Sequence, residues 1–261
     1  FILSLFYDNM DYLAKKNAHK RDAFITFDEG PHIYTINGDS NYTSVTTWVH
    51  SHFEAFDADT IISRMMNSPN WSKSKYFGQS VEEIKQGWEK NRDEAATAGT
   101  AMHLDIEKYY NKVPVTNDSI EFQYFKNFEK AFPDLVPFRT EWMIWDVELM
   151  FAGSVDMVYI NEDGTLSIFD WKRSKQIKKT SGNWMKTSIT PCISHLPDSN
   201  FWHYSLQLNT YKAIIERNYG FRVKDLVLIC LYPENDNYQY ISVPNLQKEV
   251  AELFEIRKAQ I

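Results

Sequence analysis

Residues 149–172 read LMFAGSVDMVYI-NEDG-TLSIFDWK, two apolar segments joined by a short polar turn sequence. The turn contains the Asn, Asp and Gly that favour tight reversals, and both flanking segments contain β-branched and aromatic residues. This pattern predicts a β-hairpin. A turn centred on the NEDG segment places Asp156 opposite a residue close to Asp170, because antiparallel strands pair residues at equal distances from the turn. We therefore expect the two carboxylates to converge at one edge of a sheet.

A lysine accompanies the two acids, because Lys172 follows Asp170 after a single residue. Carboxylate oxygens bind hard divalent cations, and an ammonium can meet the negative charge that develops on a phosphate during hydrolysis. Asp170 follows the apolar stretch Leu-Ser-Ile-Phe, and a carboxylate inside such a strand needs a compensating cation. The pattern therefore favours a metal-dependent phosphodiester hydrolase. The alternative is two carboxylates that face water at the ends of their strands.

The rest of the chain alternates helical and strand-like patterns. Helices are predicted over 5–18, 118–131, 201–218 and 245–259, and further strands over 24–27, 32–36, 140–147, 226–232 and 238–243. A capping box at Ser80 begins a long helical pattern. We expect Gly99-Thr100 to interrupt it, with a second helix following. The order predicts an α/β protein in which an N-terminal helix and hairpin elaboration, 1–80, packs on a core, 81–261, as one structural unit.

Four further side chains occur in pairs at helical spacing. His103 and Glu107 lie four residues apart, so they share a helix face and can both address one metal ion. Gln207 and Tyr211 have the same spacing on the predicted helix 201–218. Glu141 begins the first strand of the central region and is a further acid expected near the substrate. For each of these the alternative is an ordinary surface residue or surface pair.

The charge of the chain is uneven. A net charge of −7 argues against a protein that coats nucleic acid nonspecifically, although a nuclease needs only a local basic region. Such a region follows Asp170 directly, where Lys172, Arg173, Lys175, Lys178 and Lys179 fall within eight residues. We interpret Arg173 and Lys175 as phosphate-contacting residues of a substrate-binding loop. The alternative is a solvated loop.

Cysteine content and hydropathy restrict the compartment. Only Cys192 and Cys230 occur, which favours a reducing, intracellular environment and argues against both a disulfide framework and a structural zinc site. No apolar run approaches the roughly 20 residues of a membrane span, so no membrane partner is expected. The chain begins with Phe1, which we interpret as a truncated N-terminus, so that any targeting segment upstream is not visible.

With these residues assembled, the chain resembles the PD-(D/E)xK nuclease superfamily. The similarity is to the RecB-type nuclease domain, a branch that includes mitochondrial genome-maintenance exonucleases and proteins of large DNA viruses. The matching motifs, in chain order, are Tyr42-Thr-Ser-Val-Thr46, Gly99-Thr-Ala-Met-His103-Leu-Asp-Ile-Glu107, Glu141, Gly153-Ser-Val-Asp156, Asp170-Trp-Lys172 and Gln207-Leu-Asn-Thr-Tyr211. One departure is Val155, which stands where the family name implies a proline.

The resemblance implies a restriction-endonuclease-like core, a mixed central sheet flanked by helices. It implies a nuclease of DNA replication or repair that depends on Mg²⁺ or Mn²⁺ and acts as an exonuclease on single-stranded or end-containing DNA. The implied metal ligands are His103, Asp156, Asp170 and the backbone carbonyl of Trp171. Lys172 is implied to orient the attacking water or to stabilise the transition state.

The resemblance also assigns roles to three residues around the metal ligands. Glu107 is implied to be a secondary acid, and Gln207 and Tyr211 to support the site and contact the DNA strand. Two alternatives stay open. One is a nucleic-acid-binding or assembly module of the same fold without turnover, and the other is a metal-dependent nuclease that acts on RNA.

Overall fold

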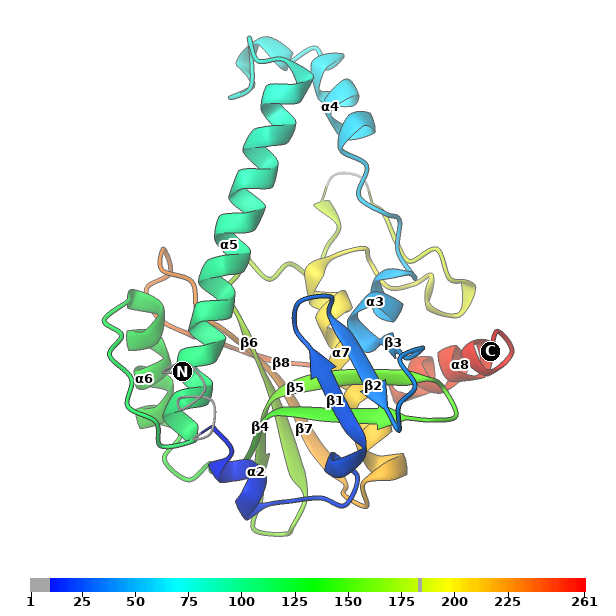
Figure 1. Ribbon diagram of the computed structural model, residues 1–261. Coiled ribbons are helices and arrows are strands. Elements are labelled where there is room, and N and C mark those ends of the chain that lie inside the picture. The colour runs from blue at the N-terminus through cyan, green and yellow to red at the C-terminus, as the bar shows by residue number, and fades with distance from the viewer. Residues whose placement is uncertain (1–9, 183–184) are drawn as a thin grey trace. The chain divides into compact units, whose positions relative to one another are not determined.

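The computed structural model describes residues 10–182 and 185–261 (Figure 1). The predicted helix 5–18 falls partly outside this range, and within it α2 spans Tyr12–Lys16. The chain divides into two compact units. The larger contains the described part of Phe1–Glu54 together with Met102–Ile261, and the smaller is Ala55–Ala101.

Six strands of the described chain form a mixed sheet in the larger unit. β4 (Val136–Asp146) runs antiparallel to β5 (Phe151–Ile160) along the whole length of β5. On the other edge of β5 lie β3 (Thr43–Ser44), parallel, and β6 (Leu166–Lys172), antiparallel. Beyond β6 the sheet continues with β7 (Val223–Cys230), parallel, and β8 (Gln239–Ser242), antiparallel to β7.

The predicted hairpin is confirmed with its register. Ile160 pairs with Leu166 across the turn, and the ladder continues to Met157 and Phe169, so Asp156 and Asp170 are the next two opposing residues. The β5 edge that β3 and β6 share is open between their ladders, because β3 pairs only as far as Ala152. Among the described residues, 153–155 therefore have a strand partner on the β4 side alone, and Asp156 is paired in neither ladder.

Helices cover both faces of this sheet. On one side lie α3 (Val45–His50), α7 (Asn200–Asn218) and α8 (Gln247–Lys258) (Figure 1). On the other lie α6 (Ile120–Ala131) and the last two turns of α5. Adjacent residues of β6 point to opposite faces, as strand geometry requires: Ile168 joins the α7 side and Phe169 the α6 side. The predicted class, a mixed α/β fold with a central mixed sheet flanked by helices, is confirmed.

The N-terminal hairpin is also present. β1 (Ile25–Asp28) and β2 (Ile33–Ile36) pair antiparallel, after a 3₁₀ turn over Asp22–Phe24. Tyr34 and Ile36 are buried with Trp145 and Ala152, so the hairpin packs on β4 and β5.

α5 spans Val81–Tyr110 without a break, so the predicted interruption at Gly99-Thr100 is wrong. A helical glycine costs about 1 kcal/mol relative to alanine, which a 30-residue helix can absorb. A Cβ at Gly99 would meet nothing within 4 Å, so no close approach calls for the glycine either. The predicted capping box is confirmed, because Ser80 N donates to Glu83 Oε2 and Glu83 N donates to Ser80 Oγ.

In the smaller unit, α4 (Ala58–Met66) and a 3₁₀ turn over Trp71–Lys73 precede α5, and Ile62 and Ile84 are its fully buried side chains. A further 3₁₀ turn in the larger unit spans Pro191–Ile193. None of the helices in the described parts of the chain is long and apolar enough to cross a membrane.

Candidate active site

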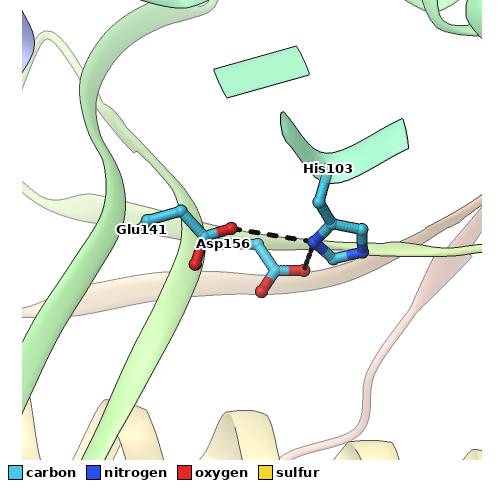
Figure 2. A group of neighbouring side chains, drawn as sticks. All are labelled: His103, Glu141 and Asp156. Atoms are coloured by element: carbon cyan, nitrogen blue, oxygen red, sulfur yellow. Dashed lines mark ion pairs between the residues drawn. The ribbon is translucent and has the colours of Figure 1, made fainter. Parts of the chain in front are cut away.

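Three side chains from three elements of the larger unit converge beside the open edge of β5. His103 comes from α5, Glu141 from β4 and Asp156 from β5 (Figure 2). One potential ligand atom of each lies within 4.8 Å of those of the other two. The His103 Nδ1 atom is 3.7 Å from Glu141 Oε1 and 3.5 Å from Asp156 Oδ2. We call these residues the His–Glu–Asp trio.

Glu141 reaches the trio through an irregular backbone. Thr140 pairs with Met157 and Trp142 with Val155, so Glu141 lies opposite Asp156, yet the ladder skips it. Its φ is +41°, a left-handed conformation that costs a non-glycine residue on the order of 1–3 kcal/mol and that clusters at functional sites. Ser154 Oγ donates to Glu141 Oε2 at 2.7 Å, which leaves Oε1 directed at the imidazole.

The backbone of Trp171 fixes two members of the trio. Its N–H donates to Asp156 Oδ2 at 3.0 Å, and its carbonyl oxygen lies 2.8 Å from His103 Nε2. A carbonyl only accepts, so Nε2 carries the proton, and in the neutral ring Nδ1 is the atom with a free lone pair. The carbonyl oxygen that was predicted to bind metal thus accepts a hydrogen bond from His103. Metal-binding histidines commonly donate their second ring N–H to a carbonyl in this way.

Opposing effects set the protonation of the trio. Burial lowers the pKa of His103, but the carboxylates of Asp156 and Glu141 outweigh it and raise the pKa to about 9. Burial raises the pKa of Asp156 above its ordinary value, against the lowering effect of His103. The imidazole therefore carries a positive charge that a divalent cation would replace.

Asp170 and Lys172 form a buried pair next to the trio. Asp170 is 2% exposed, and its Oδ2 lies 2.7 Å from Lys172 Nζ. Beyond this contact with the ammonium, Oδ2 has no other polar partner among the described residues. Burial and the nearby Asp156 raise the pKa of Asp170 to about 6. A buried carboxylate needs a cation beside it, which is the ammonium here and could also be a metal ion.

Lys172 stays charged in this environment. Burial lowers the pKa of the ammonium, but the carboxylates of Asp170 and Asp156 outweigh burial and raise it above the ordinary value. Its Nζ also lies 4.4 Å from the centroid of the Tyr204 ring on α7. A fixed ammonium beside a group of carboxylates can bind an anion next to a cation.

Glu107 lies one helical turn beyond His103 on α5 and is partly buried. Burial raises its pKa, the charge of Glu141 adds to the effect, and the result is about 7. A carboxyl group with this pKa can take up or release a proton near neutral pH.

α7 contacts the site through Tyr211, which packs directly on Gly153. A Cβ at Gly153 would lie 2.7 Å from Tyr211 Cε1, closer than real contacts, so the position requires glycine. The ring is 3% exposed, and its hydroxyl accepts from Gln207 Nε2 at 3.1 Å. Gln207 Nε2 also donates to Thr46 Oγ1 at 3.0 Å. The two residues therefore link α7 to β5 and to α3, which is a supporting arrangement.

The two basic residues predicted to contact substrate have different surroundings. Arg173 Nε donates to Glu121 Oε1 on α6 at 2.7 Å, and both side chains are largely buried. Its charge is therefore neutralised within the fold. Lys175 lies 3.1 Å from Glu234 Oε2 in an exposed pair. Exposed pairs are worth little, so Lys175 can exchange its partner for another anion.

Sequence reasoning missed two residues beside the trio. One is Ser154, the hydroxyl that holds Glu141, which lies inside the quoted motif but carries no signal of this role. The other is Tyr34 of β2, which is 5% exposed. Burial raises its pKa, the charges of Glu141 and Asp156 add to this, and the pKa reaches about 12. Neither residue has a sequence pattern that marks it.

Comparisons with known proteins give distant structural neighbours. No protein-family model and no curated protein matches the chain. Among solved structures, a candidate exonuclease from Eubacterium rectale aligns over 60% of this chain and 72% of its own, with a TM-score of 0.31 and 11% identity. SSO0001 aligns over 100% of this chain and 89% of its own, with a TM-score of 0.33 and 13% identity.

Proposed function

We propose that this protein is a metal-dependent nuclease that hydrolyses DNA phosphodiester bonds. The observation that carries the proposal is the His–Glu–Asp trio next to the buried Asp170–Lys172 pair. The trio offers ligands for a cation and the pair offers a fixed ammonium, and phosphodiester hydrolysis needs both positive charges. The order of these residues along the chain, which resembles that of the PD-(D/E)xK superfamily, also supports the proposal.

The donor set fits a hard divalent cation, Mg²⁺ or Mn²⁺. Carboxylate oxygens predominate, and one imidazole accompanies them. His103 Nδ1, Glu141 and Asp156 would hold the ion, next to the buried carboxylate of Asp170, whose Oδ2 contacts Lys172. When bound, such an ion polarises a phosphate and lowers the pKa of water.

The side chains themselves divide the remaining work. Lys172, held by Asp170 and Tyr204, is positioned to stabilise the negative charge of the phosphate oxygens, a contribution of about 2–4 kcal/mol for a preorganised donor. Glu107, with its pKa near 7, can accept or return a proton close to the reacting groups. Trp171 keeps His103 and Asp156 in fixed orientations through its backbone.

We propose that the protein acts as an exonuclease on single-stranded or double-stranded DNA with an accessible end. The test uses end-labelled linear DNA and covalently closed circular DNA in Mg²⁺ and in Mn²⁺, with EDTA as the metal-free arm and an RNA strand of the same sequence as the alternative substrate. Release of the end label from the linear DNA, with the circle left intact, is the expected result. Cleavage that persists in EDTA would contradict a metal-dependent mechanism.

Two variants test the site itself. Asp170→Asn and Lys172→Ala should each abolish cleavage and retain the circular dichroism of the wild type. Glu162→Gln and Lys224→Ala are matched controls, because they remove one acid and one lysine at exposed positions and should cleave like the wild type. A cleavage rate equal to that of the wild type in either site variant would refute the proposal.

A further inference from the structure

Tyr204 extends the row of side chains that Gln207 and Tyr211 form on α7. It lies three residues before Gln207 and seven before Tyr211, so the three share one face of the helix. The Gln207–Tyr211 motif of the sequence does not include it. Tyr211 packs on β5, whereas the partly buried Tyr204 reaches the end of β6, where its ring centroid lies 4.4 Å from Lys172 Nζ. Tyr204 therefore contacts the one ammonium that the proposed reaction uses.

The Lys172 ammonium has one charged and one aromatic partner. Asp170 Oδ2 is 2.7 Å from Nζ, and the Tyr204 ring is within the roughly 6 Å over which an aromatic face attracts a cation. The Lys172 side chain is 18% exposed, so water screens both contacts only weakly. Within the described chain the Tyr204 hydroxyl makes no hydrogen bond. The ring face, rather than the hydroxyl, is therefore what Tyr204 offers to the ammonium.

A cation bound at the trio would change these two contacts differently. Asp170 is close enough to Asp156 of the trio for the two charges to interact, since the charge of Asp156, after burial, raises the pKa of Asp170. A divalent cation beside Asp156 would therefore attract the Asp170 carboxylate and repel the Lys172 ammonium. The Tyr204 ring is uncharged, because burial raises the pKa of its phenol above the ordinary value. The attraction between this ring and the ammonium has no metal ion competing for it.

Lys172 needs a second partner because of the nature of a lysine side chain. Its four-carbon stem is flexible and its ammonium is strongly hydrated, so an ammonium that loses its carboxylate turns toward water. Asp170 and Tyr204 are the two groups that contact this ammonium within the described residues. Once Asp170 is shared with a metal ion, the ring is the contact that keeps the ammonium in place.

We infer that Tyr204 is a positioning residue whose ring holds the Lys172 ammonium in the active site when a divalent cation attracts the Asp170 carboxylate. Tyr204 acts through Lys172 and through its ring face, so phenylalanine can replace it and an aliphatic residue cannot. The effect on cleavage rests on the proposed function, but the hold of the ring on the ammonium does not.

The first experiment observes Lys172 by NMR in protein that contains ¹³C-labelled lysine, without DNA. Protons over an aromatic ring resonate upfield, so the ε-methylene signal of Lys172, assigned by its loss in Lys172→Ala, should lie upfield of other lysines in EDTA. Tyr204→Phe should keep this shift and Tyr204→Leu should remove it. The shift should also persist when Mg²⁺ replaces EDTA. Its disappearance in Mg²⁺ overturns the inference.

The second experiment measures the cleavage of end-labelled DNA in Mg²⁺. Tyr204→Leu should lower kcat about tenfold, the effect of one desolvated contact between a cation and a ring, and leave KM nearly unchanged. Tyr204→Phe should cleave like the wild type. Phenylalanines with one, two and three ring fluorines at position 204 should lower kcat stepwise, because fluorine weakens the negative ring face and barely alters its shape. A purely structural role would not produce this gradient.

Tyr109→Leu is the matched control. Tyr109 of α5 is a partly buried tyrosine whose ring centroid lies 3.8 Å from Nζ of Lys126 on α6. Its replacement removes the same kind of contact elsewhere in the larger unit and should leave kcat unchanged. If Tyr204→Leu does not fold, the fluorinated proteins, which keep the shape of the ring, decide the question.

Separate outcomes refute the inference and the proposed function. Wild-type kcat in Tyr204→Leu, or equal kcat across the fluorinated series, overturns the inference and keeps the nuclease. A loss of kcat in Tyr204→Phe assigns the role to the hydroxyl and overturns the inference as well. A wild-type protein that never cleaves DNA refutes the nuclease, and the NMR signal of Lys172 then decides by itself whether the ring holds the ammonium.

Discussion

Replacing Gly153 with alanine tests whether α7 is packed on β5 as tightly as the structure indicates. The new methyl carbon would lie 2.7 Å from Tyr211 Cε1, 3.1 Å from its hydroxyl oxygen and 3.3 Å from Cζ. The ring is 3% exposed and its hydroxyl is bonded to Gln207, so it cannot simply rotate into solvent. Either α7 or β5 must shift, and β5 carries Asp156.

The expected cost follows from overpacking. Inserting a methyl group into a packed core typically costs 1–3 kcal/mol, and the usual gain from replacing a strand glycine by alanine, about 0.5–1 kcal/mol, offsets part of it. We expect a net destabilisation of about 1–2 kcal/mol. In a chain of this size that lowers the melting temperature by about 2–8 °C. Cleavage should fall as well, because Asp156 moves relative to His103.

Urea unfolding followed by tryptophan fluorescence measures the change, and Tyr211→Ala completes a double-mutant cycle. Tyr211→Ala alone should cost about 3–5 kcal/mol, but in its background Gly153→Ala has room and should be neutral or stabilising. Gly99→Ala is the matched control, since its Cβ meets nothing within 4 Å in α5, and it should stabilise by up to about 1 kcal/mol. A Gly153→Ala protein with wild-type stability and cleavage would refute the packing argument.

Three further predictions concern charge. Burial lowers the pKa of His52 in the folded protein to about 4, below its ordinary 6.5. As the pH falls the unfolded chain takes up the proton first, so the free energy of unfolding should be full above pH 6.5 and fall by at most about 3 kcal/mol by pH 4. Urea titrations should find a smaller loss in His52→Asn. Asp22→Ala should cost about 3–5 kcal/mol in urea unfolding, because it leaves the buried guanidinium of Arg139 unpaired; a loss below 1 kcal/mol would contradict this. Mn²⁺ at a hundred times its dissociation constant should stabilise the protein by about 2.7 kcal/mol in thermal melts, and Glu141→Gln should reduce the shift; equal shifts in both proteins would argue against Glu141 as a ligand.

Local sequence was sufficient to predict the hairpin and the position of Asp156 relative to Asp170. The turn residues of the NEDG segment fixed where the chain reverses, and pairing at equal distances then placed Asp156 opposite Asp170. The same reasoning located the first hairpin and most helices to within a few residues. It failed at Gly99, where a local propensity cost was read as a break although the rest of α5 is strongly helical.

The parts that sequence could not supply are long-range or conformational. No pattern signals that Glu141 adopts a positive φ and so points its carboxylate at His103. Nor does the basic run show that Arg173 is neutralised by Glu121, 52 residues away in the chain, while Lys178 is left without an ion pair among the described residues. These properties depend on which elements pack together, and a local pattern does not encode that.

The backbone role of Trp171 has a consequence for how this site can vary. Its indole is 1% exposed and packs against Phe125 and Phe128, so packing in the core determines which side chain fits at this position. The two bonds that orient His103 and Asp156 come from the peptide groups, which nearly every amino acid supplies. Side-chain scanning at position 171 would therefore register a folding defect and overlook how the backbone orients His103 and Asp156. A change to the main chain would expose it: replacing the amide N–H of residue 171 by an ester oxygen removes the bond to Asp156 and leaves the indole in place.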